Sequence, residues 1–134
     1  MLFRSDVVAC RIAPHHFHDV LAAVREMARI ARHRVVVEDN LFFDEASEEA
    51  ERLRDPTHVR CYSEDQWKEM LTEAGLEVEL LERFERHPVV EDWLVRVDTP
   101  LEDAARVREL LSENVEEGVL RLKSIVVKAR RSQK

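Results

Sequence analysis

Two short runs decide the fold, DVVACRIA at residues 6–13 and RVVVED at residues 34–39. Both are nearly continuous in apolar, largely β-branched side chains, which predicts strands covered on both faces, as in a parallel sheet. Between them, residues 19–31 place apolar side chains at spacings of three and four, the pattern of an amphipathic helix. Because strand, helix and strand in succession form a βαβ unit with a right-handed crossover, the sequence predicts an α/β fold.

The rest of the chain adds further helices and two strands to this unit. Residues 63–74 give the sharpest helix signal, since SEDQ at 63–66 fits a capping box and Gly75 supplies a C-terminal stop. Thr99 and Pro100 are typical of the N-cap and first residue of another helix. The other expected elements are a helix over 44–54, a short helix over 88–98, an antiparallel or edge strand over 77–84 and a last strand over 119–129. We expect one domain, residues 1–134, with about four strands and four helices.

The composition excludes several classes of protein. The chain has 45% hydrophobic and 37% charged residues, and no apolar run near the ~18 residues that a membrane span needs. The first residues lack the apolar segment of a secretory signal, so we expect a cytoplasmic protein without a membrane span. With 21 Lys and Arg against 28 Asp and Glu, the net charge of -7 would repel a phosphate backbone, and we expect no nucleic-acid partner. The basic residues Lys128, Arg130, Arg131 and Lys134 are expected to form a frayed, solvated C-terminus.

Glycines and cysteines are few, and both counts restrict the chemistry. The two glycines, Gly75 and Gly118, cannot build a GxGxxG turn or a Walker loop, so no nucleotide motif is complete in this sequence. The two cysteines, Cys10 and Cys61, lie far apart in a chain without a secretory signal, and we expect both to be reduced.

The main candidate site is the polar loop CRIAPHHFH at residues 10–18, which follows the first strand. In open α/β sheets, ligands bind in the crevice beyond the carboxyl ends of the strands. Three functional interpretations are open: a zinc site completed by His58 or Cys61, nucleophilic catalysis by Cys10, or a small-molecule pocket in which histidine and arginine donate hydrogen bonds or histidine acts as a general base. A solvated loop that caps the helix is the structural alternative. We favour the pocket and expect no metal.

Two more polar segments follow this loop. Glu38, Asp39 and Asn40 end the second strand, so they lie beside the histidine loop if the two strands are neighbours. A carboxylate beside an imidazole suits acid-base chemistry or cation binding, but Asp and Asn are also ordinary turn residues. The segment ERLRDPTHVR at 51–60 is dense in opposite charges, and it is either a solvated ion-pair network or a lid over a substrate.

Together these segments resemble the C-terminal half of the class I S-adenosylmethionine-dependent methyltransferases, in the branch similar to the ubiquinone and menaquinone biosynthesis methyltransferases. The resemblance covers most of residues 3–85. Residues 6–17 match the family's fourth strand and the loop after it, residues 24–29 match the following helix, and residues 35–40 match the fifth strand. The family's lid and late helix are matched by residues 51–58, 62–67 and 74–76. The resemblance implies a partial Rossmann-like methyltransferase sheet in the family's order 4-5-7-6, with flanking helices.

The resemblance also implies S-adenosylmethionine as the cofactor and suggests roles by position. By position in the family, some residues would face the transferred methyl group, some would lie on the cofactor side and some on the substrate side. The resemblance implies catalytic roles for His15 and His16, cofactor binding by Cys10, Arg11, Ile12 and Phe17, and substrate binding by Asp39, Asn40, Arg54 and His58.

The family binds its cofactor mainly through a glycine-rich turn after the first strand, whereas this sequence begins just upstream of the fourth. We therefore expect a truncated domain that is inactive by itself. Its strand 6–13 would be open along one edge and pair with a second copy, as a homodimer, or with a chain that supplies the missing half. The alternatives are a non-catalytic dimerisation or scaffold remnant and a small-molecule binding module that uses the same crevice.

Overall fold

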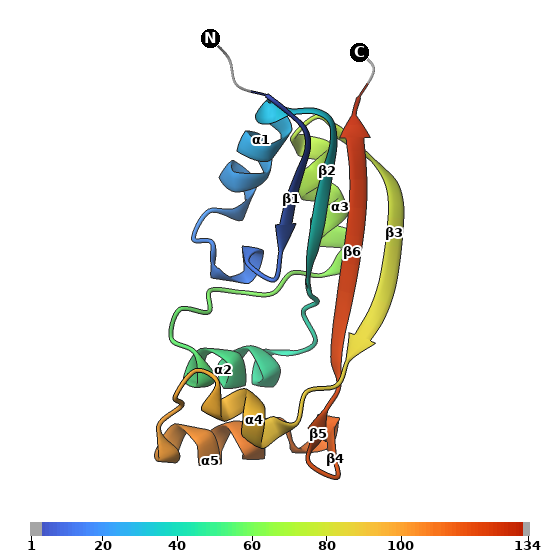
Figure 1. The fold of residues 1–134 in the computed structure, drawn as a ribbon. Coiled ribbons are helices and arrows are strands. Elements are labelled where there is room, and N and C mark those ends of the chain that lie inside the picture. Colours follow the sequence, from blue (N-terminus) through green and yellow to red (C-terminus); the bar gives the residue numbers. More distant parts are fainter. Residues whose placement is uncertain (1–3, 133–134) are drawn as a thin grey trace.

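The structure is a computed structural model that describes residues 4–132, built around a four-stranded sheet (Figure 1). Strand β1 (Ser5–Arg11) lies at one edge and pairs in parallel with β2 (Ala31–Asn40). Strand β6 (Leu122–Arg131) is antiparallel to β2 and to β3 (Leu76–Arg86), which forms the other edge. The order β1-β2-β6-β3 confirms the α/β class, the βαβ unit and the predicted order of the sheet.

Two helices cover one face of the sheet. Helix α1 (Val20–Ile30) connects β1 to β2, and helix α3 (Glu64–Glu73) precedes β3. The predicted capping box is present, because the Ser63 side chain accepts a hydrogen bond from the Gln66 amide and the Gln66 side chain accepts one from the Ser63 amide. Both helices bury apolar side chains in one cluster with the sheet, whose fully buried members include Val24, Trp67, Val35, Ile125 and Ala129. The main core therefore lies between these helices and the strands.

The opposite face of the sheet is less protected. Along β2, every second residue from Val35 to Asp39 is buried, whereas the residues between them are only partly buried. Strand β1 is exposed along much of its length, and Val7 is 52% exposed. The prediction that residues 6–13 are covered on both faces is therefore wrong, because the face of β1 that carries Val7, Ala9 and Arg11 is exposed.

The remaining elements gather at one end of the sheet (Figure 1). Helices α2 (Glu45–Arg54), α4 (Val90–Val95) and α5 (Leu101–Leu110) pack around a second apolar cluster. The small hairpin of β4 (Val115–Glu116) and β5 (Val119–Leu120) contributes Leu120 to the same cluster. Two single 3-10 turns, Pro14–His16 and Ser112–Asn114, complete the structure.

Two expected boundaries differ from the structure. The strand predicted over 119–129 is divided at Arg121 into β5 and β6, because a turn at Gly118, whose φ is 76°, folds β5 back onto β4. Helix α5 begins after Pro100, which is its N-cap, and the Thr99 hydroxyl does not cap it. That hydroxyl instead donates to the Arg54 carbonyl at 3.0 Å, which ties the start of α5 to the end of α2.

The basic residues near the C-terminus belong to the sheet. Lys128 Nζ lies 3.3 Å from a Glu79 carboxylate oxygen, and Arg130 forms an ion pair of 3.0 Å with Glu77 across the β3–β6 ladder. The predicted frayed end is therefore wrong as far as β6 extends, while Lys134 lies outside the described residues. Over residues 4–132, no helix has the length and apolar character needed to cross a bilayer.

Candidate functional site

Polar side chains meet at the carboxyl ends of the parallel strands β1 and β2. The 3-10 turn after β1 carries His15, and the end of β2 carries Asp39. His15 Nδ1 lies 2.7 Å from Asp39 Oδ1, and the His15 amide donates to Asp39 Oδ2 at 2.9 Å. His15 is 8% exposed and Asp39 is 1% exposed. The two segments that the sequence singled out therefore form one buried imidazole–carboxylate pair.

Asp39 fixes the orientation of the imidazole. Its carboxylate also accepts the Asn40 amide at 2.8 Å, so its two oxygens serve three donors. The His15 carbonyl accepts the amides of Val59 and Arg60 at 2.7 and 3.0 Å, which holds the backbone of the turn. With Nδ1 donating to the carboxylate, Nε2 is the nitrogen of neutral His15 that can accept a proton. A histidine oriented in this way is suited to general-base chemistry.

The charge of Asp39 also sets the proton affinity of His15. Burial by itself lowers the pKa of this imidazole, and the hydrogen bond and negative charge of Asp39 act in the opposite direction. The more distant charges of Glu51 and Asp55 add to the second effect. The net result is a pKa above the usual value for histidine, so His15 binds a proton more tightly than a free imidazole does.

The backbone beside this pair is strained. Ile12, the first residue after β1, has a φ of 51°, which is rare for a β-branched residue and costs about 1–3 kcal/mol. Its amide donates to the Glu38 carbonyl at 2.8 Å, so the neighbouring strand holds the conformation in place. Strain of this kind concentrates at functional sites, where the surroundings enforce it.

A cavity of about 350 Å³ opens next to His15, within the range of roughly 300–1,000 Å³ that is usual for small-molecule sites. Four predicted site residues form part of its wall, namely Ile12, His15, Asn40 and Arg54. The remainder of the wall comes from α2, α4, the end of β3 and the start of β6, and consists of Glu51, Arg86, His87, Pro88, Trp93, Arg96 and Leu122.

The other predicted residues on the histidine loop do not form part of this wall. Arg11 pairs with Glu38 at 2.9 Å and is largely exposed. His16 Nδ1 lies 3.1 Å from the Thr57 carbonyl oxygen and 3.1 Å from its hydroxyl. Phe17 packs against the main core. The cofactor and catalytic roles of these residues stay predictions.

Cys10 lies in β1 and is partly buried. Burial is the main cause that raises the pKa of its thiol, and the negative charge of Asp39 adds to it. Because the thiolate is the nucleophilic form, this environment opposes nucleophilic catalysis by Cys10.

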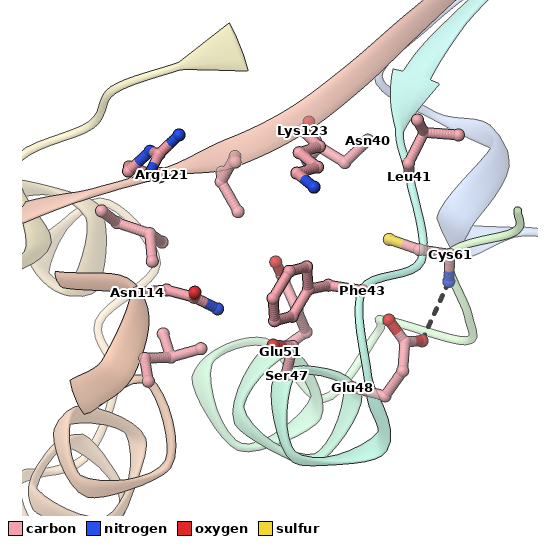
Figure 2. A pocket seen from close by; sticks show the side chains of 13 residues that line it. Asn40, Leu41, Phe43, Ser47, Glu48, Glu51, Cys61, Asn114, Arg121 and Lys123 are labelled. Carbon is pink, nitrogen blue, oxygen red and sulfur yellow. Dashed lines mark hydrogen bonds between the residues drawn. The ribbon is translucent and has the colours of Figure 1, made fainter.

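A second buried cluster joins α2 to the segment between α2 and α3, and Figure 2 shows two of its residues, Glu48 and Cys61. Glu48 Oε1 accepts the Cys61 amide at 2.9 Å and lies 3.1 Å from His58 Nε2. Burial would raise the pKa of Glu48, but the hydrogen bonds from His58 and Cys61 outweigh it and lower the pKa. His58 is only 5% exposed and is absent from the wall of the cavity beside His15, so its predicted role with substrate stays a prediction.

The same cluster contains the one set of three metal-ligating side chains among residues 4–132. A Glu48 oxygen, a His58 ring nitrogen and the Cys61 sulfur lie within 4.8 Å of one another. A metal ion would have to displace the hydrogen bonds that already satisfy Glu48, and it would need Cys61 as a thiolate. Without a metal ion, burial and the nearby charges of Glu51 and Glu48 raise the pKa of Cys61 strongly, so the thiol form is favoured.

Sequence reasoning missed several residues of the cavity wall. The missed residue Glu51 lies three residues before the predicted Arg54 on α2, and the missed residue Trp93 lies three residues before Arg96, the C-cap of α4. This spacing places each pair on one side of its helix. The spacing was available in the sequence. What it could not indicate is that the two helices face the same cavity as His15, since that depends on how the end of the sheet is packed.

Comparisons with known proteins identify relatives but match no family profile. The chain is 34% identical over 102 residues to the uncharacterized methyltransferase YcgJ of Bacillus subtilis (strain 168), covering 71% of this chain and 40% of that protein. It is 36% identical over 111 residues to the uncharacterized protein YafE of Escherichia coli (strain K12), covering 76% of this chain and 54% of YafE. The chain thus spans about two fifths of one relative and about half of the other.

Solved structures share the fold. The crystal structure of YcgJ from Bacillus subtilis superimposes with a TM-score of 0.88 at 26% identity, and a candidate methyltransferase, BH2331, from Bacillus halodurans C-125 does so with 0.86 at 30% identity. Each comparison covers 97% or more of this chain and 65% of the other. The magnesium protoporphyrin IX methyltransferase of Synechocystis PCC 6803, solved with bound S-adenosylmethionine, matches at 14% identity with a TM-score of 0.51, which shows likeness of fold alone. The sheet and its flanking helices are therefore a partial, Rossmann-like methyltransferase fold.

Proposed function

We propose that this chain forms the methyl-acceptor side of an S-adenosylmethionine-dependent methyltransferase, with His15 as its general base. The observation that carries the proposal is the buried His15–Asp39 pair on the wall of a 350 Å³ cavity at the carboxyl ends of β1 and β2. The name of the Bacillus subtilis relative and the shared fold support a methyltransferase in particular.

The chain's own contribution to catalysis would be positioning and proton removal. The cofactor, when bound, supplies an electrophilic methyl group. A hydroxyl or amine acceptor would lose its proton to His15 Nε2 as its oxygen or nitrogen bonds to the methyl carbon. The bond between that carbon and the sulfur of the cofactor would break, which leaves S-adenosylhomocysteine. Asp39 then stabilises the imidazolium by its charge and by the 2.7 Å contact to Nδ1. Because the pKa of His15 is raised, the neutral base becomes available only as the pH rises through that pKa.

The described residues do not include the glycine-rich turn of a cofactor site. Gly75 follows α3 and Gly118 joins β4 to β5, while the connection from β1 to α1 contains no glycine. The glycine-rich turn that binds the cofactor in the methyltransferases that this sequence resembles would therefore come from further polypeptide. The open edge of β1, where Val7 is half exposed, is suited to pair with such a segment. By itself the chain would then be inactive.

A non-catalytic dimerisation domain is the competing function. It accounts for the open edge of β1, which a second copy of the chain would cover. It gives no reason for the strained backbone at Ile12 or for the burial of His15 against Asp39 beside a cavity. The strained backbone at Ile12 and the buried His15–Asp39 pair also fit a module that binds a small molecule without catalysing a reaction. Binding by such a module would not depend on the proton-accepting nitrogen of His15.

The test is binding of S-adenosylhomocysteine, the product of the cofactor, by isothermal titration. We expect no binding by the chain alone up to about 1 mM, and binding in the micromolar range by a chimera in which this chain replaces the matching part of Bacillus subtilis YcgJ. In the chimera, His15→Ala should leave this affinity within about twofold and abolish methyl transfer. His18→Ala, which alters an exposed histidine of the same loop, is the matched control.

Two outcomes would count against the proposal. A folded chimera that fails to bind S-adenosylhomocysteine would remove the methyltransferase assignment. Micromolar binding by the monomeric chain alone would show that the cofactor contacts do not depend on further polypeptide.

A further inference from the structure

The cavity beside His15 has a positive lining that methyl transfer by itself does not require. Its wall contains one carboxyl group, Glu51, and five basic side chains, Arg54, Arg86, Arg96, His15 and His87. Burial is the largest influence on Glu51 and raises the pKa of its carboxyl group, while the charges of His58, Arg54 and His15 act in the opposite direction. The basic side chains of the wall thus outnumber its single carboxyl group.

We propose that this cavity recognises the carboxylate of a small organic acid, with Arg54 and Arg96 as its cationic partners. The inference rests on the proposed function and names the class of methyl acceptor.

Arg54 is the central residue of this inference. Its Nε donates to the Trp93 carbonyl at 3.0 Å, and its guanidinium carbon lies 4.0 Å from the centre of the Trp93 ring. These contacts fix the side chain and leave the terminal nitrogens of its guanidinium available. Within residues 4–132, no carboxylate oxygen lies within 4 Å of Arg54, although the residue is only partly exposed. The negative charges of Glu51 and Asp55 act on Arg54 only from beyond ion-pair distance. A partly desolvated cation without a direct ion pair is a ready partner for an anionic ligand.

Arg86, at the same wall, differs in having a direct ion-pair partner. It donates to Glu38, whose carboxylate is also paired with Arg11. One carboxylate is shared by two arginines there, so Arg86 is held by the protein but only partly neutralised. Arg96, at the C-terminal end of α4, is exposed and has no carboxylate within ion-pair distance in the described part of the chain. Arg54 and Arg96 are thus the two arginines of the wall that form no direct ion pair among residues 4–132.

The remainder of the wall suits the body of such an acid. Ile12, Pro88, Trp93 and Leu122 supply apolar surface, and the 350 Å³ volume accommodates a ligand of modest size. His15 lies on the same wall, so one ligand can present its carboxylate to the arginines and its nucleophilic group to the imidazole. Paired arginine–carboxylate contacts would fix the position of the ligand as well as its affinity.

The experiment compares two probes of nearly equal size and shape, the anion 4-hydroxybenzoate and the neutral 4-hydroxybenzamide. Each is titrated into the purified chain and followed by NMR at the indole N–H of Trp93. We expect the acid to bind at least about tenfold more tightly than the amide. Arg54→Gln should remove this preference, with the affinity for the amide unchanged within about twofold, and Arg96→Gln should weaken only the acid. Arg54→Lys, which keeps the charge, should retain part of the preference.

Arg52→Gln is the matched control, because Arg52 lies on the same helix but is exposed and absent from the cavity wall. Equal affinity for acid and amide, no binding of either probe, or an equal loss in Arg52→Gln would each overturn the inference. If Arg54→Gln weakens S-adenosylhomocysteine binding in the chimera but not binding of the acid, the carboxylate recognised is that of the cofactor and the inference fails. The acid titration needs no cofactor, so its failure is distinguishable from failure of the methyltransferase proposal.

Discussion

Replacement of Asp39 by asparagine tests whether the carboxylate charge holds His15. Asp39 is 1% exposed and accepts the His15 amide, His15 Nδ1 and the Asn40 amide. Asparagine keeps one acceptor oxygen and turns the second into a donor, so at least one of these three donors loses its partner. Hydrogen bonds to charged groups contribute about 1.5–3 kcal/mol, and a buried donor left unpaired costs a similar amount. We expect Asp39→Asn to lower the free energy of unfolding by about 2–4 kcal/mol.

The loss should depend on pH in a defined direction. In the wild type, the raised pKa of His15 gives a stabilisation that is complete below the unfolded pKa of about 6.5 and is lost as the pH rises through the folded pKa. Without the carboxylate, burial, the largest influence on His15, is opposed only by the more distant charges of Glu51 and Asp55. The pKa of His15 should then fall, so acid stabilises the variant less than the wild type. The deficit of Asp39→Asn should therefore be larger at about pH 5.5 than at about pH 8.5. Glu51, whose pKa is also raised, titrates in both proteins and largely cancels in the difference.

Urea denaturation at the two pH values measures this difference. Asp98→Asn is the control, because Asp98 is exposed and has a φ of 52° that asparagine also tolerates, so its effect should stay within about 0.5 kcal/mol. A deficit in Asp39→Asn that is the same at both pH values would refute the reasoning, since it would mean that the charge of Asp39 does not act on the protonation of His15.

Three further predictions concern the fold and its open edge. Trp67→Ala should lower the free energy of unfolding by about 3–5 kcal/mol because Trp67 is fully buried. Trp67→Phe should cost well under half of that, since the buried indole N–H has no hydrogen-bond partner to lose. Equal losses for the two variants in urea denaturation would contradict this. Gly75→Ala should lower the free energy of unfolding by about 1–2 kcal/mol because of its φ of 82° alone, since no atom lies within 4 Å of an added Cβ. An unchanged free energy of unfolding would show that the turn can change its backbone conformation. Val7→Lys should change the free energy of unfolding by under about 0.5 kcal/mol, because Val7 is half exposed, and should lower self-association measured by light scattering. A dimer that persists in this variant would argue against pairing through β1.

The fold was predictable where local patterns agreed with their surroundings. The helix over 63–74 and the parallel pair β1–β2 follow from the capping box at Ser63 and from the apolar runs, and both are present. Prediction failed where the result depends on tertiary neighbours. The burial of β1 was overestimated because its apolar side chains do not indicate which face of the strand other elements cover. The division of the last strand depends on the hairpin turn at Gly118.

The sequence by itself determined the α/β class, the order of the elements and the position of the histidine loop and Asp39 at the carboxyl ends of adjacent strands. These properties follow from periodicity, capping residues and the handedness of the βαβ crossover, which act over short stretches of chain. Only the tertiary structure decided that His15 rather than His16 meets Asp39, and that Arg54 shares a cavity with His15. Adjacent histidines on a 3-10 turn point in different directions, and the direction that is buried depends on packing between elements that are distant in the chain.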